Sequence, residues 1–181
     1  MKRSLPSILL LSSAGLLGLA AARPVQEPAA FTRTTIDVGV VVRDVEASAA
    51  FYADTLGFTE LEGFSVPAGF CTDTGLTDGH PLAVRVFVLG AGEQATKIKL
   101  MEVPAAEPKA GDHAFIHSQL GLSYLTVFVR DTNAALQRLE RAGVSPIAKG
   151  PVRIGEEPGG SYLTLVRDPD GNLIELIGPK L

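Results

Sequence analysis

The stretch IDVGVVVRDVEASAAFYADTLG, residues 36–57, joins a β-branched run to an amphipathic segment that ends at a glycine. The run Ile36–Val42 predicts a strand, and the apolar spacing from Val45 to Leu56 predicts a helix. Asp44 stands where a helix N-cap is expected, because a carboxylate there accepts hydrogen bonds from N–H groups of the first turn. The residues therefore predict a strand, a short turn and a helix.

The same pattern returns in YLTVFVRDTNAALQRLERAG, residues 124–143. Arg43 and Arg130 are 130 − 43 = 87 positions apart, and Asp44 and Asp131 keep that offset. Each helix is followed by three predicted strands. In the first half they are Thr59–Phe64, Ala83–Leu89 and Thr96–Val103, and in the second half Ser145–Ala148, Ser161–Arg167 and Leu173–Ile177. The chain is thus an internal repeat of two βαβββ units, with a long loop at 65–81 and a linker at 104–121.

The composition excludes some classes of function and the N-terminus suggests a destination. A formal net charge of −4 with 20% charged residues gives no basic surface for nucleic acid. Lys2 and Arg3 precede an apolar run, Ile8–Ala20, that closes on small residues, so residues 1–22 are expected to be a signal peptide and 23–35 a linker. We expect the mature protein to be exported, periplasmic or extracellular, with no membrane segment after cleavage. Cys71 is then an unpaired thiol in an exported protein.

The paired units, with VVVRDVEASAAFYADTLGF early and DPDGNLIELI late, resemble the vicinal oxygen chelate superfamily. This superfamily includes glyoxalase I, bleomycin-resistance proteins and extradiol dioxygenases. The resemblance implies an α+β fold over 36–178, in which module one (36–103) and module two (122–178) form a curled mixed or antiparallel sheet. Lyases, isomerases, dioxygenases and simple binding proteins share this fold, so the resemblance does not choose among these activities. Modules of such proteins pair within one chain or across a homodimer, and the sequence leaves both open.

The resemblance also implies a site on the concave face, where metalloenzymes of the superfamily carry ligands from the first and last strand of each module. The corresponding residues here are Asp37, Lys99, Tyr124 and Glu175. Strand alternation agrees, because in each of these strands the polar residues fall on one face and the apolar residues on the other.

This residue set favours a site without metal. An ammonium such as Lys99 repels a cation, and a phenol such as Tyr124 is a weak ligand at neutral pH. We therefore expect no metal and no cofactor. A structural charge network around Lys99, a pocket for a small polar molecule, and metal-free catalysis with Glu175 as base all remain open.

The sequence thus predicts an exported protein whose polar barrel cavity binds a small molecule. The alternative is a metal-dependent glyoxalase-type lyase or dioxygenase that uses a degenerate site. Whether the protein is an enzyme is left undecided, and so is the identity of the ligand. No role is assigned to Cys71 or to the histidines His80, His113 and His117, although His113 and His117 would share one face if their segment were helical.

Overall fold

The computed structural model describes residues 31–33, 35–92, 95–156 and 159–181. Residues 33–181 form one compact unit. The predicted signal peptide, residues 1–22, lies outside the described residues, as does most of the predicted linker. Within the described part of the chain, no helix is both long enough and apolar enough to cross a membrane.

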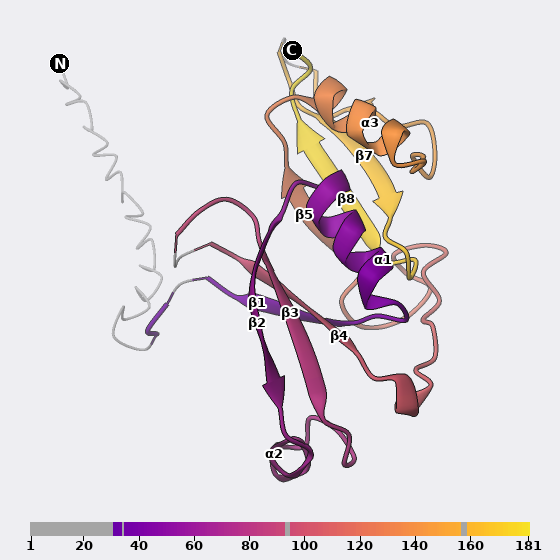
Figure 1. The fold of residues 1–181 in the computed structure, drawn as a ribbon. Coiled ribbons are helices and arrows are strands. Elements are labelled where there is room, and N and C mark those ends of the chain that lie inside the picture. Colours follow the sequence, from indigo (N-terminus) through magenta and orange to yellow (C-terminus); the bar gives the residue numbers. More distant parts are fainter. Residues whose placement is uncertain (1–30, 34, 93–94, 157–158) are drawn as a thin grey trace, which may run out of the picture. The chain divides into compact units, whose positions relative to one another are not determined.

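Module one forms a four-stranded mixed sheet in the order β1-β4-β3-β2 (Figure 1). Strand β1 runs parallel to β4, and the other two pairs are antiparallel. The elements in chain order are β1 (Asp37–Val41), α1 (Val45–Ala50), the π-helical turn η2 (Phe51–Thr55), β2 (Thr59–Val66), α2 (Ala68–Thr74), β3 (Leu82–Val88) and β4 (Lys97–Glu102).

Module two repeats this arrangement, with strand order β5-β8-β7-β6 and a parallel β5–β8 pair. The βαβββ repeat predicted from the sequence is therefore confirmed. After the short 3₁₀ helix η3 (Pro104–Ala106) in the linker, its elements are β5 (Tyr124–Phe128), α3 (Thr132–Arg141), β6 (Val152–Arg153), β7 (Tyr162–Arg167) and β8 (Leu173–Gly178).

The two helices that cover the sheets begin at the predicted N-caps. The Asp44 carboxylate accepts hydrogen bonds from Glu46 N and Ala47 N at 3.0 Å each. Asp131 caps α3 in the same way, through Asn133 N and Ala134 N. The repeated Val-Arg-Asp sequence therefore marks the same strand-to-helix junction in both modules.

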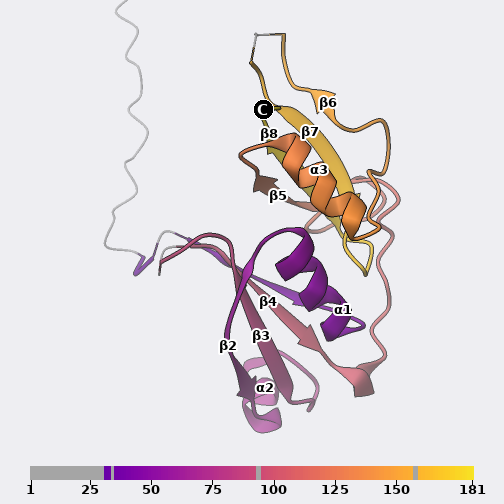
Figure 2. The ribbon, with the colours of Figure 1, turned by 45° about the horizontal axis from the view of Figure 1, so that its top comes forward.

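Two predicted segments differ in the structure. Ser145–Ala148 is not a strand, although Ile147 N donates one backbone hydrogen bond to Leu165 O of β7. The strand that pairs with β7 on the edge away from β8 is β6 (Figure 2). Pro146 lacks the N–H that a continuous ladder would need.

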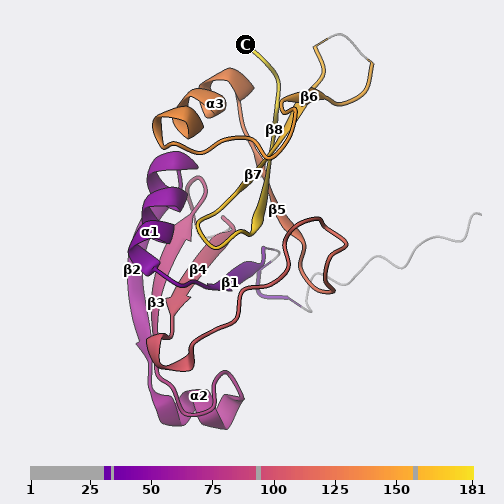
Figure 3. The ribbon, with the colours of Figure 1, turned by 90° about the vertical axis from the view of Figure 1, so that its right-hand side faces the viewer.

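The long loop predicted at 65–81 contains a helix, α2, which the sequence analysis missed (Figure 3). Cys71 of α2 is fully buried against Val84, Val86 and Met101. The thiol therefore packs as a small apolar side chain.

One apolar core lies between the sheets and the helices of both modules. Tyr52, Phe87, Leu100, Leu139 and Ile174 are each at most 1% exposed and belong to it. In the first module these side chains come from one phase of the strands, so residues of the opposite phase, including Asp37 and Lys99, face away from α1. Strand alternation thus separates the face covered by α1 and α3 from the opposite face, which we call the inner face and which α2 partly covers in module one.

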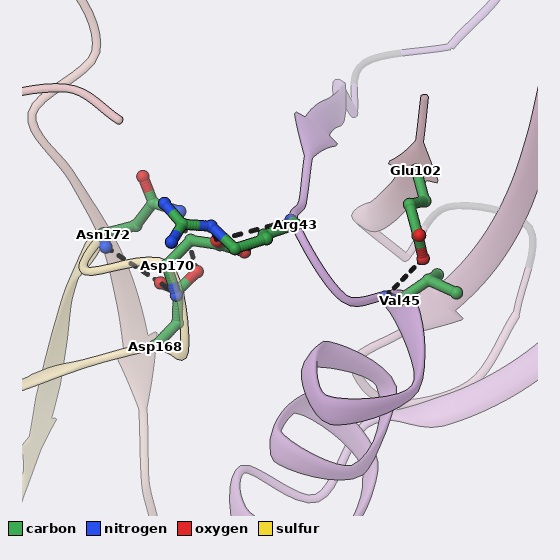
Figure 4. A network of polar contacts seen from close by, with 6 residues as sticks. All are labelled: Arg43, Val45, Glu102, Asp168, Asp170 and Asn172. Carbon is green, nitrogen blue, oxygen red and sulfur yellow. Dashed lines mark hydrogen bonds and ion pairs between the residues drawn. The ribbon is translucent and has the colours of Figure 1, made fainter. Parts of the chain in front are cut away.

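The turn between β7 and β8 carries a buried carboxylate that also contacts the first module. Asp168 is 5% exposed and accepts hydrogen bonds from Asn172 N and Asn172 Nδ2, both at 2.8 Å, and from Asp170 N at 3.0 Å (Figure 4). Tyr52 of η2 donates its hydroxyl to the same carboxylate at 3.2 Å. Asp170 in turn accepts from Arg43 N at 3.2 Å. The DPDGN turn is therefore held by its own hydrogen bonds, and it is also bonded to Arg43, just before α1, and to Tyr52 of η2.

Tyr52 predicts a loss of stability at high pH. Burial, followed by the charge of Asp168, raises the pKa of Tyr52 well above its usual range. Because this folded pKa exceeds the unfolded value of about 10, the contribution of Tyr52 is complete below pH ~10 and is lost as the pH rises further. We expect Tyr52→Phe to lower the free energy of unfolding by about 1–2 kcal/mol at pH 7, and by less at pH 11, in urea titrations. A difference between the two proteins that stays constant from pH 7 to 11 would contradict this assignment.

Candidate functional site

In module one, strand pairing brings two of the predicted site residues together. Parallel pairing of β1 and β4 sets Asp37 opposite Lys97 and Gly39 opposite Lys99. The Lys99 ammonium reaches the Asp37 carboxylate, with Nζ 2.9 Å from Oδ2. The hydrogen bond from Lys99 holds the pKa of Asp37 below its usual range. Asp37 and Lys99 therefore form a charged pair on the inner face of module one.

In module two, Glu175 forms a hydrogen bond within its own sheet. Thr126 lies directly opposite Glu175 in the β5–β8 pair, and its hydroxyl donates to Glu175 Oε2 at 2.8 Å. No ion pair within 4 Å joins Glu175 to Lys99, both of which the structure describes. The charge network around Lys99, one of the alternatives left open, therefore includes Asp37 but does not extend to Glu175, whose hydrogen-bonding partner comes from its own sheet. Thr126 was missed as a site residue, although strand alternation had placed it on the same face as Tyr124.

Apolar side chains surround these polar groups and remain exposed on the inner faces. Residues that stand opposite each other on neighbouring strands share a face, and this pairing assigns each exposed apolar residue to the inner face. On module one they are Val41, Leu61 and Phe64, which are 40–49% exposed, and on module two Tyr124, Phe128 and Val152, which are 48–76% exposed. Exposed apolar side chains that share a face with charged pairs are typical of a binding or assembly surface.

A cavity of about 250 Å³ lies between β1 and residues 122–125. Tyr124 lines it, together with Gly39, Ser123 and Asn172. Asp37, Lys99 and Glu175 are not among its lining residues. A Cβ at Gly39 would lie 3.1 Å from Met101 Cε, so the glycine leaves room for the methionine. Of the four predicted site residues, Tyr124 therefore lines this cavity.

Both carboxylates among the predicted site residues already have partners. Catalytic metal sites use three or four nitrogen, oxygen or sulfur ligands and keep a position open for substrate. Here the Asp37 carboxylate is paired with an ammonium, and Glu175 accepts from Thr126. Among the described residues, no cluster of three or more His, Cys, Asp or Glu side chains could hold a metal ion.

The histidines lie in loops. His113 and His117 do not share a helical face, because the linker is irregular there. Arg167 of β7 donates to the backbone oxygen of His113 at 2.6 Å and so fixes this part of the linker, while His117 stacks on Phe115. His80 hydrogen bonds through its backbone to Thr77.

Comparison with known proteins identifies the family. The profile of the Glyoxalase/Bleomycin resistance protein/Dioxygenase superfamily matches residues 34–176. The chain belongs to this superfamily. No curated protein matches it significantly.

Solved structures share the fold at low sequence identity. A glyoxalase family protein from Bacillus cereus has a TM-score of 0.66 at 19% identity, over 87% of this chain and 100% of that one. A glyoxylase/bleomycin resistance protein/dioxygenase domain from Frankia sp. has a TM-score of 0.56 at 18% identity, over 81% and 90%. A putative glyoxalase from Bacillus halodurans has a TM-score of 0.56 at 15% identity, over 83% and 98%.

The Lys99–Asp37 pair predicts a modest, acid-sensitive contribution to stability. Its side chains are 32% and 19% exposed, so solvent screens the pair and Lys99→Met should lower the free energy of unfolding by only about 1 kcal/mol at pH 7. Because the folded pKa of Asp37 lies below its unfolded value of about 3.9, this contribution is present above pH ~4 and is lost as the pH falls through the folded pKa.

Chemical denaturation of the wild type, Lys99→Met and Lys97→Met between pH 2.5 and 7 measures this contribution. Lys97→Met is the matched control, since no ion pair within 4 Å is found for Lys97 among the described residues. If Lys99→Met and Lys97→Met behave alike at every pH, the pair does not contribute as described.

Proposed function

We propose that the protein binds a small polar molecule on its inner face without a metal ion. The observation that carries this proposal is the ion pair between Lys99 and Asp37, which occupies two of the four positions where metalloenzymes of the superfamily place ligands. A fixed ammonium in that place satisfies the carboxylate and repels a divalent cation. The same ammonium and the Tyr124 phenol are donors, and the Glu175 carboxylate is an acceptor, that can hold a polar ligand.

The surroundings of these groups suit a ligand with both polar and apolar parts. Lys97 adds a second cation beside the pair, so the inner face of module one carries more positive than negative charge. On module two, Glu175 supplies an acceptor, which the hydrogen bond from Thr126 holds in place. The exposed apolar side chains of both faces offer contact area to the rest of the molecule.

We also propose that the protein forms a homodimer in which inner faces of two copies cover each other. Exposed Phe128 and Tyr124 on module two, and Phe64 on module one, make a monomer with both faces uncovered costly in water. The charges are complementary, because Lys97 and Lys99 lie on one module and Glu175 on the other. A partner copy would enclose Asp37, Lys99 and Glu175, which do not line the cavity that Tyr124 borders.

Export completes the proposal. The basic residues and apolar run at positions 2–20 support cleavage after Ala22, which would give a mature chain starting at Arg23. The mass of the mature N-terminus decides this point directly.

The metal-free proposal predicts protein that carries no stoichiometric metal. Protein purified without chelators should contain no bound metal by elemental analysis. Nickel, zinc, manganese and ferrous iron should leave its Tm unchanged, because the part of the chain that the structure describes has no group of three or more His, Cys, Asp or Glu side chains that could bind them. Stoichiometric metal that is lost in Asp37→Ala or Glu175→Ala would instead support the lyase or dioxygenase alternative.

The ligand arm of the proposal uses a thermal-shift screen of small polar metabolites. Compounds that raise the Tm of the wild type should lose that effect in the double variant Lys99→Met, Tyr124→Phe, and keep it in Lys149→Met. Lys149→Met is the control because it removes the same charge from an exposed loop position outside the inner faces. A screen without any compound that distinguishes these variants would refute the assignment of the site.

The proposed dimer predicts that a charge at Phe128, which is 76% exposed within one chain, prevents association of two copies. Light scattering should give twice the chain mass for the wild type and the single mass for Phe128→Glu, because a buried carboxylate without a partner disfavours association. Leu181→Glu is a matched control, since Leu181 is 84% exposed at the C-terminus and bonds through its backbone to Asp131, the N-cap of α3. A monomeric wild type would contradict the dimer.

A further inference from the structure

A second cavity lies on the helix-covered side of the molecule, away from the inner faces. It has a volume of about 500 Å³ and opens between the α1–η2 segment and the end of α3. Figure 3 shows α1 and α3 adjoining, and Arg138 of α3 donates to the backbone oxygen of Thr55 at 3.3 Å. A second space of about 500 Å³ shares Phe51, Val144 and Pro169 with it, so the cavity continues along the molecule.

Small side chains and a change of helix type create this space. Ala47 and Ala50 of α1 and Ala142 after α3 face the cavity, where larger residues would fill it. The helix also changes to π-helical geometry at Phe51–Thr55, with Leu56 N bonded to Phe51 O at 3.1 Å. Such π-helical turns are rare and occur frequently at functional sites. This one supplies Phe51, Asp54 and Thr55 to the cavity wall.

The charged groups of the cavity favour an anion. Arg138 and Arg141 lie three residues apart on α3, so both project from one side of the helix. They face a single carboxylate, Asp54. Among the described residues, no ion pair within 4 Å joins these three side chains. The Arg138 Nε bond to Thr55 orients its guanidinium and leaves its terminal nitrogens available.

The part that the two spaces share is apolar, and the second space is also bordered by Ser145, Arg167 and Asp168. Phe51, Val144 and Pro169 line the part that the two spaces share, and Ile147 borders the second. A guanidinium pair at one end and an apolar floor at the other match a carboxylate with a short hydrocarbon chain, because arginine binds carboxylates through two parallel hydrogen bonds.

We propose that this cavity between α1–η2 and α3, which we call the helix groove, is a binding site for an aliphatic carboxylate. The carboxylate binds to Arg138 and Arg141, and the chain lies over Phe51, Val144 and Pro169. The site is separate from the inner face, so its occupancy does not depend on the function proposed there. Arginines in the last turn of a helix also stabilise the helix dipole, and the experiment distinguishes the two roles.

Octanoate is the probe and 1-octanol its uncharged counterpart. Calorimetric titration of the full mature chain with octanoate should show saturable binding, and backbone amide shifts should change for residues 47–55 and 138–144. The double variant Arg138→Gln, Arg141→Gln should weaken binding at least about tenfold, since two charge-assisted hydrogen-bonding groups are lost. 1-Octanol lacks the carboxylate, so its affinity for the wild type should be no higher than the affinity of octanoate for the double variant.

Two further variants distinguish binding in the helix groove from nonspecific attraction of octanoate to positive charge. Arg130→Gln removes the same charge before the other end of α3 and should leave octanoate binding unchanged. Ala50→Leu keeps both arginines but fills the groove, and should abolish binding. The proposal is overturned if octanoate does not saturate, if Arg130→Gln weakens it as much as the double variant, or if Ala50→Leu binds normally. It is equally overturned if the shifts fall on the inner face instead.

Discussion

The arrangement of the two modules depends on the hydrogen bonds that the buried carboxylate of Asp168 accepts. It accepts three hydrogen bonds inside its own turn and a fourth from Tyr52 of the first module. A buried charge is tolerated only when its hydrogen-bonding capacity is satisfied, so the turn cannot open or shift without a large cost. Since Tyr52 lies in the core that both modules share, the same carboxylate fixes the turn and the contact between modules.

The turn also sets the phase of β8 and thereby the candidate site. Asp168 N bonds to Asn172 O, and β8 starts at the next residue, Leu173. From that start, Ile174 and Leu176 point into the core while Glu175 points to the inner face, because side chains alternate along a strand. A shift of one residue would bury Glu175 among apolar side chains. In module one, the register between β1 and β4 places Asp37 and Lys99 together on the inner face.

Strand alternation and the repeat were enough to predict the fold, because both are local patterns that the sequence displays directly. They were also enough to place Asp37, Lys99 and Glu175 on inner faces. The partner of Glu175 was not predictable in this way, since it depends on which side chain stands opposite in the folded sheet, and that is Thr126. Helix α2 was not predicted, because the Gly, Thr and Asp residues of its segment are typical of a loop. It is stabilised by the packing of Cys71, which no local pattern reveals.

A double-mutant cycle between Tyr52→Phe and Asp168→Asn tests most directly whether this hydrogen bond joins the modules. The free energies of unfolding of the wild type, both single variants and the double variant would be measured at pH 7. If the bond is formed as described, the two changes are coupled by about 1–2 kcal/mol, because either one alone removes the same charge-assisted interaction. Effects that add to within about 0.3 kcal/mol would show that Tyr52 and Asp168 act independently and would contradict the account.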